Sequence, residues 1–284
     1  MANVLYYHLD VFSTTPLGGN GLTVVLVPNS LEKDLMLKIA QEFKQYETAF
    51  IFPFEDGSYP VRIFTIQEEL AFAGHPILGM AALLHQLHYP KLANCTIPLK
   101  IGERVVEIFS ENKGSYYAEM MDQGLPQFGM TLLSGQYEGI CSAMNLQIGD
   151  LDEKYPLQVV STGLPYLLLP VLCDLSKVRV VSSKLEQLIA PFGAKFVYVF
   201  NTQTLECRTW DNSGLYEDSA TGSAAGPLFA YLVQQGKRMA TEIISLNQGR
   251  FVDRPSTIHG SCDAQGHVHV SGNVVLFASG EFFV

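Results

Sequence analysis

Two short stretches place small and polar residues where an apolar helix begins. They read "AGHP" at residues 73–76 and "ATGS" at residues 220–223. A helix start usually takes Ser, Thr, Asp or Asn as its cap, and the backbone amides of its first turn carry a partial positive charge. Small residues let a ligand approach these amides, so each stretch predicts a site for a carboxylate. The predicted binding residues are Gly74, Thr221, Gly222 and Ser223; ordinary N-capping is the alternative for Thr221 and Ser223.

Glu47, His75 and Asp218 carry side chains that could move or direct a proton. Glu47 stands at the start of an apolar segment, between Tyr46 and Thr48. Desolvation favours the protonated form of a carboxyl group, which suits a group that gives and takes protons. A glutamate at the exposed end of a strand is the commoner alternative. His75 and Asp218 could orient or polarise a substrate through hydrogen bonds, although His75 could also bond within its own turn.

The elements that must position these residues occur twice along the chain. Strand patterns at 21–28 and 163–170, "GLTVVLVP" and "GLPYLLLP", align Gly on Gly and Pro on Pro. The segments "RIFT" and "RTWD" and the two helix starts follow in the same order. Their first residues pair 21 with 163, 62 with 208 and 73 with 220, and these offsets are 142, 146 and 147. A colinear series with a nearly constant offset predicts a duplicated structure.

The predicted fold is α+β, with two pseudo-symmetric halves, each a barrel-like, mostly antiparallel sheet around a central helix. We assign residues 1–120, completed by a strand at 273–284, to the first half and residues 121–272 to the second. A cleft between such halves is the usual place for a small-molecule site. The pattern also predicts a helix from about residue 31 to 44 with Ser30 as its cap and a counterpart helix from Ser182. It places Pro76 at the first position of its own helix.

Composition limits the kinds of partner. The net charge of −10 argues against a surface for nucleic acid or anionic membranes, and no apolar run reaches the roughly 18 residues of a membrane span. The five cysteines are widely spaced, so a reducing cytoplasmic location is expected. His267 and His269 alternate in "HVHVSG", but no third metal ligand is evident nearby.

Several motifs together resemble the phenazine-biosynthesis isomerase (PhzF-like) family, which has the diaminopimelate-epimerase-like fold. They are "GGNGLTVVLVP", "YETAF", "ELAFAGHPILG", "EDSATGSAAG" and "SGNVVLFASGEF", in that order over essentially the whole chain. The resemblance implies that Glu47 is the general acid/base and that His75, Asp218 and Ser223 belong to the site. It also implies a homodimer and no metal or organic cofactor. The sequence departs from the family pattern at Tyr46, Ile66 and Ser219, which are expected in the site walls.

The reaction implied by this resemblance moves a proton, and with it a double bond, within a small cyclic substrate that bears a carboxylate. Tyr46 is expected to contact that substrate. Epimerases of the same fold class use two thiols at these helix starts, whereas this chain has Ala73 and Ala220. A Ser-His-Asp hydrolase built from Ser223, His75 and Asp218 lacks the G-x-S-x-G turn. A non-catalytic protein that binds a small acid, or that acts through protein contacts, is the remaining alternative.

Overall fold

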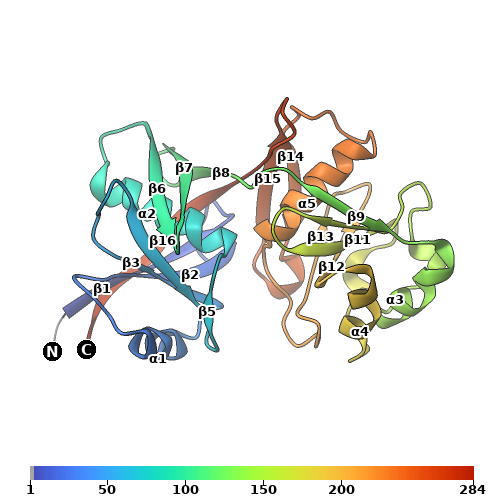
Figure 1. Cartoon of the computed structure of the whole chain (residues 1–284), viewed down its shortest axis with the longest axis horizontal. Coiled ribbons are helices and arrows are strands. Elements are labelled where there is room, and N and C mark those ends of the chain that lie inside the picture. The colour runs from blue at the N-terminus through green and yellow to red at the C-terminus, as the bar shows by residue number, and fades with distance from the viewer. Residues whose placement is uncertain (1–2) are drawn as a thin grey trace. The chain divides into compact units, whose positions relative to one another are not determined.

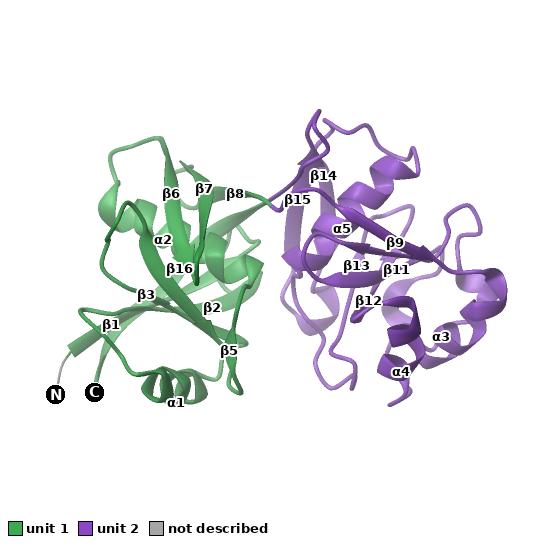
Figure 2. Ribbon diagram, in the orientation of Figure 1, with its two compact units in different colours: residues 1–122, 271–284 green, residues 123–270 purple. Residues whose placement is uncertain are grey.

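The computed structural model describes residues 3–284, which form two compact units (Figures 1 and 2). Among the described residues, unit 1 comprises 3–122 and 271–284, and unit 2 comprises 123–270. In the described part of the chain, no helix is both long enough and apolar enough to cross a membrane.

Unit 1 is a closed barrel of eight strands. Its strands follow one another around the barrel in the order β1 (Asn3–Val11), β2 (Asn20–Leu26), β3 (Glu47–Ile51), β4 (Tyr59–Phe64), β6 (Asn94–Ile101), β7 (Arg104–Asn112), β8 (Tyr117–Asp122) and β16 (Val268–Phe283). The barrel closes because β16 pairs antiparallel with β1, from Val11 opposite Val274 to Asn3 opposite Phe283. The short strand β5 (Glu69–Leu70) pairs with β4.

Helix α2 (Gly74–His88) occupies the interior of this barrel. All twelve residues from Gly74 to His85 are buried, which is the pattern of a helix surrounded by core on all sides. Helix α1 (Lys33–Phe43) lies outside and packs Met36, Ile39 and Ala40 into a cluster that contains Phe50 and Phe64. The duplicated design therefore uses one apolar helix as core and one amphipathic helix as cover.

Unit 2 is built from a five-stranded sheet and a second group of strands. The sheet has the order β13 (Cys207–Arg208), β12 (Phe196–Asn201), β11 (Pro165–Val171), β10 (Gln158–Ser161) and β9 (Gln127–Thr131). Strands β14 (Ile244–Gln248) and β15 (Ser256–Cys262) pair with each other, and β15 pairs with β16. Helix α5 (Gly222–Gln234) packs against β10, β11 and β15 and is buried from Ala224 to Leu232.

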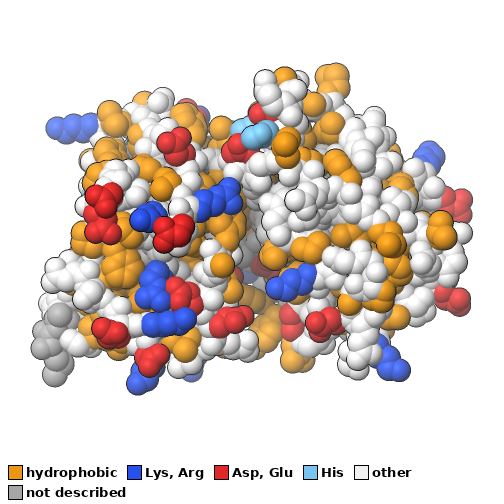
Figure 3. All heavy atoms as spheres, in the orientation of Figure 1, with side chains coloured by type: hydrophobic (Ala, Val, Ile, Leu, Met, Phe, Trp, Pro, Cys, Tyr) orange, Lys and Arg blue, Asp and Glu red, His pale blue; other side chains and the backbone are white. Residues whose placement is uncertain are grey.

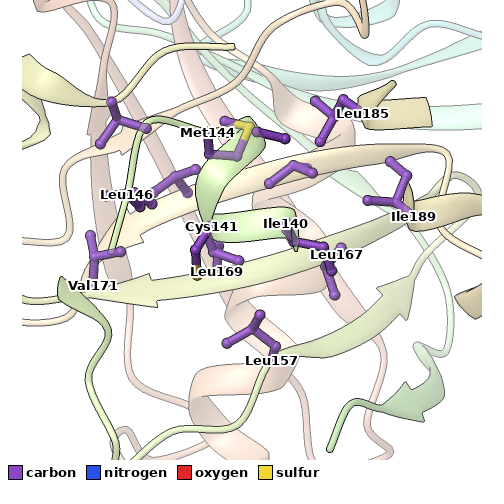
Figure 4. Close-up of a cluster of buried hydrophobic side chains, with 14 of the residues drawn as sticks. Ile140, Cys141, Met144, Leu146, Leu157, Leu167, Leu169, Val171, Leu185 and Ile189 are labelled. Atoms are coloured by element: carbon purple, nitrogen blue, oxygen red, sulfur yellow. The ribbon is translucent and has the colours of Figure 1, made fainter. Parts of the chain in front are cut away.

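Two short helices, α3 (Tyr137–Ala143) and α4 (Leu185–Ile189), cover the other side of the unit 2 sheet. They close a second apolar cluster against Leu167 and Leu169 of β11 (Figure 4). Single turns of 3-10 helix complete the connections at Ser134–Gln136, Ile148–Asp150, Leu175–Lys177, Ala190–Phe192 and Arg250–Val252.

The pairing of strands confirms the duplication. In unit 1, β1 and β2 are antiparallel, β2 and β3 are parallel, and β3 and β4 are antiparallel. The same series recurs in unit 2 for β10, β11, β12 and β13. The predicted α+β fold, two similar halves around central helices, is therefore confirmed.

Each central helix has a glycine against which a side chain from outside the helix packs closely. A Cβ atom on Gly79 would lie 2.4 Å from Leu22 Cδ2, and one on Gly226 would lie 2.0 Å from Gln123 Oε1. These two positions are 147 residues apart, the same offset as between the helix starts. A larger residue at either position would require the Leu22 or Gln123 side chain to move.

Three local predictions were wrong. The residue that precedes α1 is Glu32, not Ser30, and it makes no side-chain cap. Pro76 is the third residue of α2. A proline is tolerated there because the N–H that it lacks would have no acceptor within the helix. The counterpart of α1 in unit 2 is the five-residue helix α4, which begins at Leu185 and not at Ser182.

Candidate active site

Glu47 and His75 form a close pair in unit 1. Glu47 is the first residue of β3, opposite Leu22 of β2, and His75 is the second residue of α2. Glu47 Oε2 lies 3.3 Å from His75 Nε2, and the two side chains are only 17% and 9% exposed. Burial lowers the pKa of His75 to about 3, so the imidazole is neutral at pH 7.

The start of α2 lacks a side-chain cap. Ala73 precedes the helix in an extended conformation and carries no polar side chain, and Pro76 supplies no amide hydrogen. The partial positive charge of the first turn therefore lies beside the Glu47–His75 pair with no capping oxygen from Ala73. Tyr46, the residue before β3, is 46% exposed.

In unit 2, Asp218 and Thr221 form a turn that leads into α5. Thr221 Oγ1 donates a hydrogen bond of 2.5 Å to Asp218 Oδ2, and the amide of Ala220 donates to Asp218 Oδ1 at 3.3 Å. Thr221 precedes the helix, yet its hydroxyl turns back to Asp218 and does not cap α5. Capping, the alternative reading of Thr221, is therefore wrong.

Ser223 is the second residue of α5, and its hydroxyl lies 2.8 Å from the hydroxyl of Tyr166 on β11. Tyr166 is buried, which raises its pKa, so the phenol stays protonated at neutral pH. Tyr166 was not predicted as a site residue. It lies within "GLPYLLLP", where an aromatic residue is expected to be part of the hydrophobic core. Its contact with Ser223 becomes evident only in the folded structure.

An arginine–glutamate pair joined by two hydrogen bonds, here called a fork, precedes each helix start, and neither pair was predicted from the sequence. Arg62 Nε and Nη2 donate to the two oxygens of Glu69 at 2.6 and 2.7 Å. Arg208 makes the same two bonds to Glu217 at 2.7 and 2.5 Å. The available signal was the match of "RIFT" with "RTWD", because each arginine precedes a glutamate across a hairpin. Basic and acidic side chains also lie side by side on the unit 1 surface in Figure 3, whereas the Arg208–Glu217 fork is buried.

Neither helix start carries a thiol, since the two positions are Ala73 and Ala220. Within residues 3–284, no three His, Cys, Asp or Glu side chains are grouped so as to hold a metal ion. His269 Nε2 instead lies 3.3 Å from Asp263 Oδ2.

The structure therefore brings Glu47 together with His75, and Asp218 together with Thr221.

A model of the phenazine biosynthesis-like protein family (PhzC-PhzF) matches residues 9–280. The chain belongs to this family. The predicted family resemblance is confirmed.

Members of this phenazine biosynthesis-like family include named isomerases. The chain is 31% identical to trans-2,3-dihydro-3-hydroxyanthranilate isomerase of Pseudomonas chlororaphis, over 97% of this chain and 98% of that protein. It is 42% identical to the structure of the predicted epimerase PA4716 from Pseudomonas aeruginosa, with a TM-score of 0.91 and 99% of each chain covered.

The fold extends beyond this phenazine biosynthesis-like family. A hydroxyproline epimerase from Agrobacterium vitis has a TM-score of 0.62 at 10% identity, over 99% of this chain and 91% of that one. This likeness confirms the diaminopimelate-epimerase-like fold. Because the helix starts here are alanines and not cysteines, the shared fold does not carry the two-thiol chemistry.

Proposed function

We propose that this protein is an isomerase that moves a proton, and with it a double bond, within a small cyclic substrate that bears a carboxylate. The observation that carries the proposal is the buried Glu47–His75 pair at the uncapped start of α2. The named isomerase activity of relatives about 30% identical supports it.

In the proposed reaction, the Glu47 carboxylate removes a proton from one ring carbon. The electron pair of the broken C–H bond forms a new double bond to the neighbouring carbon, and the π electron pair of the original double bond moves to the carbon at its far end. Glu47 then returns a proton to the carbon at the far end of the shifted system, so that atoms and charge balance. One carboxyl group serves as base and then as acid.

His75 supports this role because it is neutral. A protonated imidazole 3.3 Å away would hold Glu47 as a fixed ion pair and weaken it as a base. A neutral imidazole can orient the carboxyl by a hydrogen bond and still leave it able to accept a proton.

The substrate carboxylate is proposed to bind at amides of the helix starts. Gly222 and Ser223 open α5, and Gly74 opens α2. First-turn amides and the Ser223 hydroxyl are suitable donors to an anion. Asp218, Thr221 and Tyr46 are proposed to contact the rest of the substrate. The cleft between halves, the homodimer and the cytoplasmic location stay predictions.

The test follows trans-2,3-dihydro-3-hydroxyanthranilate in D2O by NMR. Glu47→Gln keeps the size of the side chain and removes its acid/base function, so we expect conversion and deuterium uptake to fall by about 10²–10⁴-fold. Glu55→Gln, at an exposed glutamate of the same unit, is the matched control and should keep the wild-type rate. Tight binding of this compound by calorimetry without turnover in the wild type would favour the non-catalytic alternative.

A further inference from the structure

Gln248 is a buried amide that contacts both ends of the turn that carries Asp218. It is the last residue of β14 and is 2% exposed. Its Oε1 accepts hydrogen bonds from Tyr198 Oη at 3.0 Å and from the Thr221 amide at 3.2 Å. Its Nε2 donates to the Asp218 carbonyl at 2.8 Å and to Thr221 Oγ1 at 2.9 Å. Both oxygen lone pairs and both amide hydrogens are therefore engaged.

These partners fix the orientation of the amide. The Thr221 backbone N–H can only donate, so it must face the oxygen of Gln248. The Asp218 carbonyl can only accept, so it must face the nitrogen. If the amide were rotated by half a turn, its NH2 group would face the Thr221 N–H, and its oxygen would face the Asp218 carbonyl oxygen. Neither contact could then be a hydrogen bond.

The fixed amide also sets the direction of the Thr221 hydroxyl. Because Thr221 Oγ1 accepts a hydrogen from Gln248 Nε2, its own hydrogen is directed to Asp218 Oδ2, 2.5 Å away. The hydrogen bonds from Gln248 to Thr221 and from Thr221 to Asp218 therefore have one possible donor-to-acceptor direction. They end on the carboxylate that the proposed function places against the substrate.

The backbone beside Gln248 holds the same turn. Gly249 has a φ of +84°, and a Cβ there would lie 2.6 Å from the Ser219 carbonyl oxygen and 2.1 Å from that of Arg254. From the other side, the Asp218 amide donates to the Thr209 carbonyl at 3.1 Å. The turn is therefore packed on both sides, and the Gln248 side chain makes three hydrogen bonds to it.

We propose that Gln248 is a positioning residue that orients the Asp218 carboxylate through Thr221 during the isomerisation. The proposal rests on the proposed function, because it needs Asp218 to act on the substrate. Gln248 itself need not touch the substrate. Its contribution should therefore appear in kcat more than in KM, and only while Asp218 is present.

Two variants test the chain of hydrogen bonds. Gln248→Met keeps the length of the side chain and removes all four bonds. Gln248→Glu keeps the shape but replaces the Nε2 donor by an oxygen, which would accept the Thr221 hydrogen and turn it away from Asp218. We expect either variant to lower kcat by about tenfold or more with little change in KM. Hydrogen exchange at the Thr221 amide should be faster in Gln248→Met than in the wild type.

The decisive comparison is a double-mutant cycle with Asp218→Asn. If Gln248 acts through Asp218, Gln248→Met lowers kcat in the wild-type background and has no further effect in Asp218→Asn. Independent, multiplicative losses would overturn the proposal and leave Gln248 with a structural role. A wild type that neither converts trans-2,3-dihydro-3-hydroxyanthranilate nor takes up deuterium would overturn the proposed function instead.

Two further variants control for folding. Asn201 is another buried amide of unit 2, which donates to the Cys173 carbonyl and accepts from the amides of Gln203 and Thr204. Asn201→Leu should lower stability but leave kcat at the wild-type value. If Gln248→Met does not fold, the cycle is run with Tyr198→Phe, which removes one of the four bonds. If Tyr198→Phe lowers kcat in the protein that retains Asp218 but not in Asp218→Asn, the proposal is supported. If it lowers kcat by the same factor in both proteins, the proposal is overturned.

Discussion

Replacing Glu217 by Gln is predicted to destabilise unit 2 far more than replacing Glu69 by Gln destabilises unit 1. Both glutamates accept two hydrogen bonds from an arginine in the hairpin before a central helix. The two forks contain the same residue types and occupy corresponding positions in the two halves of the duplicated fold. They differ in burial, with side chains 8% and 8% exposed at Arg208–Glu217 and 31% and 24% exposed at Arg62–Glu69.

Loss of the buried ion pair is expected to cost more stability because water has little access to the Arg208 side chain, which is 8% exposed. The Arg208 guanidinium lies 4.5 Å from the Trp210 ring and 4.0 Å from the Phe251 ring, and it also donates to the Leu175 and Val178 carbonyls. Glu217→Gln leaves this cation buried without its counter-charge, which costs about 3–5 kcal/mol. At the more exposed fork, water replaces the lost carboxylate, and the cost of Glu69→Gln is about 0.2–1 kcal/mol.

Urea unfolding at low ionic strength measures both losses. The chain has one tryptophan, Trp210, so its fluorescence reports on unit 2, while amide NMR signals of β4 and α1 report on unit 1. Arg62→Lys and Arg208→Lys are matched controls that keep the charge and remove the fork. Equal losses for Glu217→Gln and Glu69→Gln, or a larger loss for Glu69→Gln, would refute the reasoning.

Two predictions concern buried groups of unit 1. Because burial lowers the pKa of His75, its imidazole NMR signals should stay constant from pH 8 to pH 5, while an exposed histidine titrates; a midpoint near pH 6.5 would contradict this. Burial raises the pKa of Glu119, so the stability that this group contributes is present below pH 4.5 and is lost as the pH rises through its folded-state pKa. Glu119→Gln should therefore be more stable than the wild type in urea unfolding at pH 8, with a smaller difference at pH 4, and equal stability at pH 8 would count against it.

The architecture could be predicted because the duplication leaves matching strings at a constant offset. Gly79 and Gly226 are separated by the same 147 residues as the two helix starts, and in the structure a side chain packs closely against each of them. The caps were harder to predict, because a helix start depends on backbone angles as well as residue type. Ser30 is a good capping residue by type, but the chain enters α1 only after Glu32.

Contacts within the candidate site could be predicted only where they are local or lie within family motifs. Thr221 and Asp218 are three residues apart, whereas Gln248 and Thr221 are 27 apart and Tyr166 and Ser223 are 57 apart. A contact of that kind depends on the register of distant strands, which no single segment encodes. The arginine and glutamate of the two ion pairs are seven and nine residues apart, so each contact depends on how a hairpin pairs its strands and not on a helical repeat.

The rate of the Glu47→Gln variant tests the central claim most directly. Trans-2,3-dihydro-3-hydroxyanthranilate is followed by NMR in D2O with the wild type and the folded variant at equal concentration. The account predicts isomerisation by the wild type and a loss of about 10²–10⁴-fold in the variant. A folded Glu47→Gln variant that isomerises the compound at the wild-type rate would contradict it.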